Sequence, residues 1–273
     1  MASTAIHATL SGALDALAAA GVEIRDMYGP GGSRFYDLFC SIDSDEVRAV
    51  LRLLAGSRGQ VADLAAGTGR FAIPLAARGH EVFAVDLSPH MLGLCRSKLD
   101  RATRSLRDRV HLMEADLRDV RLPDNLVAVV ISAGSISLVP RVERPMLLGR
   151  LARALDPRGH LLISVFTIDL TDPGALDLCE LLTLPAEGFV ATFVDQVNPA
   201  TAMRTVALLP HACGGQAIPP VVYRSTVETV DLNGLLADAS AAGLVVARTI
   251  TLQREERGRS ALLLDFARGR ARP

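Results

Sequence analysis

The chain has 273 residues, 49% of them hydrophobic, and a formal net charge of −1 at pH 7. This apolar content can build one large domain, or a core with an insertion. The near-zero charge argues against the basic surface that draws proteins to nucleic acid or anionic membranes. The four cysteines are scattered without C-x-x-C spacing. That pattern favours reduced cysteines in a cytoplasmic protein, and no apolar run reaches transmembrane length.

The first 57 residues are expected to precede the core. Residues 2–20 predict an amphipathic helix; a signal peptide is disfavoured because no basic segment precedes the apolar residues. Residues 43–46 have the pattern of a capping box and predict a second helix through residue 54. Between these helices, residues 26–37 are rich in glycine and predict a flexible loop that contains Tyr28 and Tyr36.

Residues 60–70 are the most informative segment. Residues 61–64 predict a buried strand, 65–69 a tight turn of small residues, and 71–77 the start of a helix. A strand, a glycine-containing turn and a helix are typical of the first half of a nucleotide-binding βαβ unit. The strand carries an acid, Asp63, near its end. A carboxylate there would repel a pyrophosphate but would suit a cationic ligand.

The pattern of an acid followed by a small-residue turn resembles motif I of the class I S-adenosylmethionine (SAM) methyltransferases. The resemblance implies that SAM binds at Asp63 and at the turn residues Ala65, Ala66, Gly67, Thr68 and Gly69. SAM carries an ammonium and a sulfonium, which an acid would attract. The alternative of an NAD-dependent oxidoreductase would require a glycine in place of Ala65 and no acid at position 63.

A second acid follows the next predicted strand. Residues 81–86 end in Asp86, at the spacing where an acid binds the ribose hydroxyls in such folds. Ser88 and Pro89 then predict a helix start. Residues 86–92 resemble motif II of the same family, which places Leu87 and Met91 near the cofactor.

Two further predicted strands end in candidate cofactor residues. Residues 110–114 are followed by Ala115, Asp116 and Leu117. The resemblance implies that Asp116 binds the adenine amino group and that the next backbone N–H faces a ring nitrogen. Residues 126–132 end at Ser132 and are followed by Ala133, and the same resemblance places these two residues at the cofactor. Acids after three successive strands are expected at one edge of an open α/β sheet, where ligands bind.

The rest of the chain is expected to complete the fold. Residues 168–230 predict a helix over 173–184 and three β-like runs; residues 231–242 predict a helix, and 244–252 and 260–267 a pair of strands. The expected fold is α/β of the class I methyltransferase type. It has a seven-stranded, mostly parallel sheet with an antiparallel C-terminal hairpin, helices on both faces, an N-terminal helical lid and a β-rich insertion. The expected domains are a lid and substrate segment at 1–57, a SAM-binding core at 58–167, a substrate-pocket insertion at 168–230 and a C-terminal completion of the sheet at 231–273.

The resemblance implies methyl transfer from SAM, with S-adenosylhomocysteine (SAH) as product. The expected acceptor is an amine or hydroxyl of a small molecule or short peptide, in specialised metabolism. An amine is preferred because no histidine stands out as a general base. The catalytic candidates are His7, His211 and Tyr36, which with Asp37 resembles a Tyr-Asp pair that places the tyrosine near the methionine end of SAM. No metal, nucleic acid or membrane partner is expected, and a homodimer is left open. The alternatives are a protein or tRNA methyltransferase and a non-catalytic binding protein.

Overall fold

The computed structural model describes residues 16–40, 45–256 and 258–269. The chain divides into two compact units. Unit 1 comprises residues 1–39, 168–229 and 255–259, and unit 2 comprises residues 40–167, 230–254 and 260–273. The N-terminal segment and the insertion therefore belong to the same unit. None of the helices among these described residues is long and apolar enough to cross a membrane.

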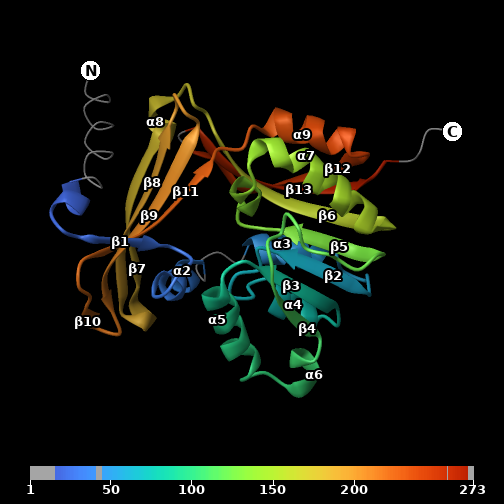
Figure 1. Ribbon diagram of the computed structural model, residues 1–273, viewed down its shortest axis with the longest axis horizontal. Helices are drawn as coiled ribbons and strands as arrows, with labels where there is room; N and C mark the ends of the chain where they lie inside the picture. Colours follow the sequence, from blue (N-terminus) through green and yellow to red (C-terminus); the bar gives the residue numbers. More distant parts are fainter. Residues whose placement is uncertain (1–15, 41–44, 257, 270–273) are drawn as a thin grey trace. The chain divides into compact units, whose positions relative to one another are not determined.

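Unit 2 is built on a seven-stranded sheet (Figure 1). The strands lie in the order β12, β13, β6, β5, β2, β3, β4. The pairs β2–β3, β2–β5, β3–β4 and β5–β6 are all parallel. The parallel strands span β2 (Gln60–Leu64), β3 (Glu81–Asp86), β4 (Val110–Glu114), β5 (Leu126–Ile131) and β6 (Leu155–Ile168).

The C-terminal strands β12 (Leu244–Glu256) and β13 (Arg259–Arg268) lie next to each other at one edge of this sheet. Only two residues connect them, which is too short for a parallel crossover, so they form an antiparallel hairpin. The predicted seven-stranded sheet with its C-terminal hairpin is thereby confirmed.

Helices cover both faces of the sheet because the central strands are apolar on both sides. Along β5, Ala128 and Val130 pack on one face, and Val129 and Ile131 on the other. The first face is covered by α3 (Asp45–Leu53), α4 (Ala72–Ala77) and α5 (Pro89–Leu99), and the second by α7 (Arg144–Ala154) and α9 (Leu232–Ala241). The remaining helical segments are short: α6 (Arg104–Arg107), η1 (Ser135–Leu138) and η2 (Arg141–Glu143).

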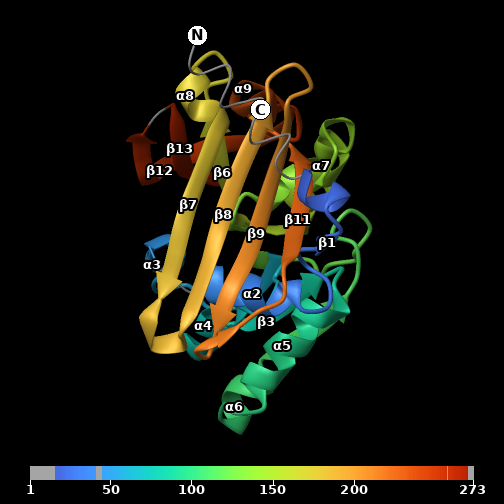
Figure 2. The ribbon, with the colours of Figure 1, turned by 90° about the vertical axis from the view of Figure 1, so that its left-hand side faces the viewer.

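Unit 1 is built on a six-stranded sheet with the order β1, β11, β9, β8, β7, in which β10 also pairs with β9 (Figure 2). The insertion contributes most of it through long antiparallel strands. The elements are β1 (Glu23–Asp26), α2 (Gly32–Cys40), α8 (Pro173–Leu176), β7 (Asp177–Leu184), η3 (Pro185–Glu187), β8 (Phe189–Asn198), β9 (Met203–Cys213), β10 (Gln216–Ala217) and β11 (Val221–Glu228).

Helix α2 packs on one face of this sheet through aromatic side chains. Phe35 stacks on Phe189 with ring centroids 5.8 Å apart, and Phe39 stacks on Phe193 at 4.8 Å. The opposite face holds a smaller apolar cluster, in which Leu17 and Val22 of the N-terminal segment pack against buried residues such as Val194. Each face of the insertion sheet is therefore covered in part by the N-terminal segment.

A buried cluster of charged side chains lies near the carboxyl end of strand β8. The carboxylate of Asp195 is 2% exposed and accepts hydrogen bonds from Arg204 at 2.7 and 2.9 Å and from Arg259 at 2.7 Å. Arg259 also donates to the carbonyl of Ala175 at 2.6 Å. Burial opposes ionisation of Asp195, but the two guanidinium groups lower its pKa on balance. The cluster ties the tip of the C-terminal hairpin to the insertion.

Two of the predicted segments are wrong. Residues 173–184 are not one helix, because only Pro173–Leu176 is helical and Asp177–Leu184 pairs along its whole length with β8. The pairing overrides the helix propensity of this leucine-rich segment. Residues 26–37 are also not an open loop, because α2 begins at Gly32. The second predicted helix corresponds to α3, whereas residues 1–15 and 41–44 lie outside the described residues.

Candidate functional site

The candidate residues of unit 2 gather where the parallel strands of the seven-stranded sheet have their carboxyl ends. Leu64 lies opposite both Val85 and Ile131, so the carboxyl ends of β2, β3 and β5 are level. Strand β4 runs parallel to β3 with Glu114 opposite Asp86. From β2 the chain continues in one direction across the sheet, to β3 and β4, and from β5 it continues in the other direction, to β6. The direction therefore reverses between β2 and β5. Such a reversal is where open α/β sheets bind ligands.

The turn after β2 follows an unusual backbone path. Ala65, Gly67 and Gly69 all have positive φ angles, of 56°, 55° and 84°. A Cβ at Gly69 would lie 2.5 Å from Sγ of Cys95, whereas a Cβ at Gly67 would meet nothing within 4 Å. Gly69 is therefore required for packing against α5, and Gly67 faces open space where a ligand can approach the backbone.

Among the acids at these strand ends, Asp63 has the most strongly shifted pKa. Its side chain is 0% exposed, and among the described residues neither carboxylate oxygen has a hydrogen-bond partner. Burial raises the pKa of Asp63 to about 7, although the charge of Arg70 and the nearby backbone N–H of Ala72, which lies outside hydrogen-bond geometry, oppose the shift. An orphaned buried carboxylate fits a site that a cationic ligand group completes.

Glu46 on α3 links the turn after β2 to the end of β5. It is 3% exposed, forms an ion pair with Arg70, and accepts a hydrogen bond from the backbone N–H of Ala133 at 3.0 Å. Ala133 has a positive φ of 52°, so this acceptor helps to hold a strained backbone. The sequence gives no signal for this role, because Glu46 is far from both partners in the chain.

Asp86 ties the turn after β2 to the turn after β3. Its Oδ2 accepts the backbone N–H of Gly67 at 2.7 Å, and its Oδ1 accepts the N–H of Ser88 at 2.8 Å. Burial raises its pKa, and these hydrogen bonds oppose the shift. Each oxygen keeps a lone pair that can accept a ribose hydroxyl. Leu87 is 66% exposed beside it, whereas Met91 is buried in the core.

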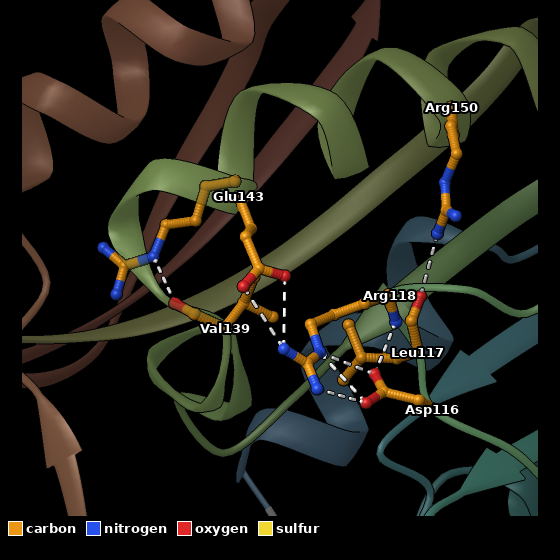
Figure 3. Close-up of polar contacts among 7 residues, drawn as sticks. Asp116, Leu117, Arg118, Val139, Glu143 and Arg150 are labelled. Carbon is orange, nitrogen blue, oxygen red and sulfur yellow. Dashed lines mark hydrogen bonds and ion pairs between the residues drawn. The ribbon is translucent and has the colours of Figure 1, made fainter.

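Asp116 is held by an arginine that the sequence analysis did not single out (Figure 3). Arg118 donates from Nη2 to Oδ2 of Asp116 at 2.7 Å, and from its backbone N–H to Oδ1 at 2.8 Å. The same guanidinium reaches Glu143 at 3.2 Å. Arg150 on α7 donates to the carbonyl of Leu117 at 3.1 Å. The hydrogen bond and charge of Arg118 lower the pKa of Asp116.

The remaining predicted residues at these strand ends are mostly enclosed. Ala66, Thr68 and Ser132 are each 6% exposed. The Thr68 hydroxyl accepts a hydrogen bond from Lys98 at 3.1 Å, which fixes the turn to α5. Ala115 follows β4 and is half-buried.

The catalytic candidates of unit 1 do not come together. Tyr36 lies in α2 with its ring 5.3 Å from that of Tyr28, on the face of the sheet that also carries Phe193. His211 is the extra residue of a β-bulge in β9 and bonds to the hydroxyl of Thr192 at 2.8 Å. Thr192 points to the opposite face from Phe193, because side chains alternate along a strand. Tyr36 and His211 are therefore directed toward opposite faces of this sheet, and His7 lies outside the described residues.

No cluster of three or more metal-ligating side chains occurs in the part of the chain that the structure describes. Three acids, one of them the orphaned buried Asp63, lie with a small-residue turn at the carboxyl ends of parallel strands, an arrangement that fits the class I methyltransferase fold. Comparison with known proteins identifies the domain. Residues 61–159 match the model of a methyltransferase domain family.

The relatives and solved structures are consistent with this match. A demethylmenaquinone methyltransferase of Clavibacter sepedonicus is 39% identical over 116 residues, 42% of this chain and 43% of the relative. The CcbJ methyltransferase of Streptomyces caelestis superposes with a TM-score of 0.70 at 19% identity, over 89% of this chain and 98% of that one. The glycopeptide N-methyltransferase MtfA has a TM-score of 0.60 at 23% identity, over 93% and 97% of the chains, and has also been solved with SAM and with SAH.

Residues 61–159 are thus identified as a methyltransferase domain, and the solved structures share the class I methyltransferase fold that the sequence predicts. The chain spans about two fifths to three fifths of the length of the first curated relatives that it matches. The matched segment covers β2 to the start of β6 and thus the whole set of strand-end acids.

Proposed function

We propose that this protein transfers a methyl group from SAM to a nitrogen of a small molecule or short peptide in specialised metabolism. The observation that carries the proposal is Asp63, a fully buried carboxylate without a hydrogen-bond partner among the described residues, behind a turn with open space at Gly67. Such a group is costly unless a ligand completes it.

We assign the binding roles from the strand-end geometry. Asp63 would lie toward the ammonium of SAM, Asp86 would accept the ribose hydroxyls, and Asp116 would accept the adenine amino group. Bound SAM supplies a methyl group already activated on a sulfonium. The chain then has to hold donor and acceptor in line and exclude water, and it does not require a nucleophilic residue of its own.

The acceptor atom is assigned to nitrogen because an amine needs only its neutral form, whereas a hydroxyl usually needs a general base. In the described structure, the turns after β2, β4 and β5 contain no histidine. His90 follows β3, but it is exposed in the first turn of α5, beside the acid assigned to the ribose. The name of the glycopeptide N-methyltransferase agrees with this preference. A hydroxyl acceptor is the second candidate.

Unit 1 is proposed to supply acceptor recognition. Its N-terminal segment and insertion share an aromatic cluster in which Tyr28, Tyr36, Phe39 and Phe193 follow one another with centroid distances of 5.3, 6.4 and 4.8 Å. Half-buried tyrosines offer an apolar face and a hydroxyl to a ligand. Tyr36 also remains the candidate residue for the sulfonium end of the cofactor, through its ring face.

Hydrogen exchange tests the assignment of Tyr36. Because α2 is already helical from Gly32, we expect added SAH to slow exchange mainly in residues 27–31. Tyr36→Ala should lower turnover, and Tyr36→Phe should lower it less if the ring face is what matters. Exchange that ignores SAH, together with full activity of Tyr36→Ala, would restrict this segment to a structural role.

The acceptor experiment uses SAM with a labelled methyl group. Matched amine and alcohol forms of candidate acceptors are incubated with the protein, and the products are analysed by mass spectrometry. Asp86→Ala serves as the control that should lose label transfer. Label on the amine form supports the proposal, and label only on the alcohol form would reassign the acceptor. Label in tRNA or protein, or SAM binding without any turnover, would favour the alternatives considered from the sequence.

A cytoplasmic location and a homodimer remain predictions. Strand β7 forms one edge of the unit 1 sheet and carries Leu181, which is 67% exposed. Light scattering of the purified protein will measure the oligomeric state.

A further inference from the structure

Helix α7 and the residue before it hold the loop that follows β4. Figure 3 shows Glu143 and Arg150 reaching from the α7 region toward this loop. Nη1 of Arg118 lies 3.3 and 3.2 Å from the two carboxylate oxygens of Glu143. Arg150 holds the same loop one residue earlier through the carbonyl of Leu117, at 3.1 Å. The loop is thus held at two adjacent residues, by Arg150 of α7 and by Glu143, the residue before α7.

Arg118 grips Asp116 from one side with both its side chain and its backbone. Nε lies 3.0 and 2.9 Å from the two carboxylate oxygens, Nη2 lies 2.7 Å from Oδ2, and the backbone N–H lies 2.8 Å from Oδ1. A guanidinium forms such two-pronged contacts only when the carboxylate lies near its plane. The orientation of the Asp116 carboxylate is therefore defined before any ligand arrives.

We propose that Arg118, supported by Glu143, is a positioning residue that orients the Asp116 carboxylate to discriminate adenine from other bases. The inference rests on the proposed role of Asp116 at the adenine amino group. Arg118 does not touch the ligand in this scheme. It acts by fixing the direction of the carboxylate lone pairs that face away from the guanidinium.

The charges of Asp116, Arg118 and Glu143 support this role. Two acids flank one guanidinium, so Arg118 cannot neutralise Asp116 completely while it is shared with Glu143. The Asp116 carboxylate stays ionised, since Arg118 lowers its pKa. An ionised carboxylate accepts hydrogen bonds and cannot donate one. It therefore favours the amino group of adenine and repels the carbonyl oxygen that hypoxanthine carries at the same position.

Two other roles for Arg118 give different expectations. A surface ion pair contributes little, because Arg118 is 41% exposed and exposed pairs have small effects. Its removal would then leave ligand binding unchanged. A guanidinium that merely occupies the adenine position would compete with the ligand, and its removal would tighten binding. The positioning role alone predicts weaker binding with reduced base discrimination.

The test measures binding of SAH and of S-inosylhomocysteine, its deaminated form, by calorimetry. Neither measurement depends on the methyl acceptor. The variants are Arg118→Ala, Arg118→Lys, Glu143→Gln and Asp116→Asn. Arg104→Ala is the control, because it removes an arginine, 87% exposed, from an ion pair with Asp108 at the end of the short helix α6. The free energy of unfolding is recorded for each variant.

We expect Arg118→Ala to weaken SAH binding about tenfold and S-inosylhomocysteine binding much less, so that the ratio of the two affinities falls about fivefold. Arg118→Lys keeps the charge but not the two-pronged contact, so it should lose most of the same discrimination. Glu143→Gln should have a smaller effect in the same direction, and Arg104→Ala none.

The outcomes separate the inference from the assignment on which it rests. If Asp116→Asn leaves the ratio unchanged, the adenine assignment of Asp116 is wrong. If Asp116→Asn changes the ratio but Arg118→Ala does not, Asp116 binds adenine without help and the positioning role is refuted. Equal weakening of both ligands by Arg118→Ala, with a lower free energy of unfolding, would show a merely structural role and would also refute it.

Discussion

The buried acid Asp63 gives a prediction that links stability to cofactor binding. Its folded-state pKa is about 7 against an ordinary value of 3.8, because the side chain is fully buried. The folded state therefore binds more protons than the unfolded state between these two values. It follows that the contribution of Asp63 to the free energy of unfolding is complete below about pH 4 and is lost as the pH rises toward 7. A shift of about 3 units corresponds to a loss of about 4 kcal/mol over this window.

Replacing the acid by its neutral isostere tests this magnitude. Asp63→Asn cannot ionise, so its stability relative to the natural protein should increase by about 4 kcal/mol between pH 4 and pH 7.5. The assay is urea unfolding at several pH values. The readout is the difference in slope, since the new amide also has polar atoms to satisfy. Asp124→Asn, at an exposed position in the loop before β5, is the control and should follow the natural profile.

The same acid should couple ligand binding to proton release. A ligand ammonium beside Asp63 favours the ionised carboxylate, so SAH binding at pH 7 should release roughly half a proton. Calorimetry in buffers of different ionisation enthalpy measures this number, and Asp63→Asn should abolish it along with most of the affinity. A pH-independent stability difference between the two proteins, or binding without proton release, would refute the assignment of Asp63.

The fold gives two further predictions. Gly69→Ala should destabilise the protein by about 2–3 kcal/mol, because its Cβ would meet Cys95 at 2.5 Å and its φ is positive, whereas Gly67→Ala should cost only about 1 kcal/mol for the backbone; equal losses in urea unfolding would contradict the packing argument. His160 bonds to buried Asp265 at 2.8 Å, which raises its pKa, so its contribution is complete below about pH 6.5 and is lost as the pH rises through the folded value; His160→Gln should remove this part of the pH profile, and an unchanged profile would show that the pair does not titrate on unfolding.

The strand-end acids could be predicted from the sequence for a general reason. Apolar runs and small-residue turns identify parallel strands, and parallel strands place their carboxyl ends at the same edge of the sheet. Asp63, Asp86 and Asp116 were therefore expected together before any side-chain contact was known. The alternation of residues along β5 likewise follows from its burial on both faces.

The supporting contacts could not be predicted, because they depend on how helices dock. Glu46 reaches the backbone of Ala133 only when α3 covers the sheet, and Arg118 reaches Glu143 only when α7 does. A sequence pattern over a few neighbouring residues carries no information about pairs of residues that are far apart in the chain. In unit 1, the bulge at His211 and the pairing of β7 with β8 decide which face or element each residue joins.

The most direct test of the account is the binding of SAH to the natural protein and to Asp86→Ala, measured by calorimetry with NAD as the negative control. The Asp86 carboxylate should contribute about 1.5–3 kcal/mol per hydrogen bond to a ribose hydroxyl. We predict that SAH binds the natural protein, that NAD does not, and that Asp86→Ala weakens SAH binding at least tenfold while the protein stays folded. Unchanged affinity in a folded Asp86→Ala, or binding of NAD in place of SAH, would contradict the assignment of the cofactor site.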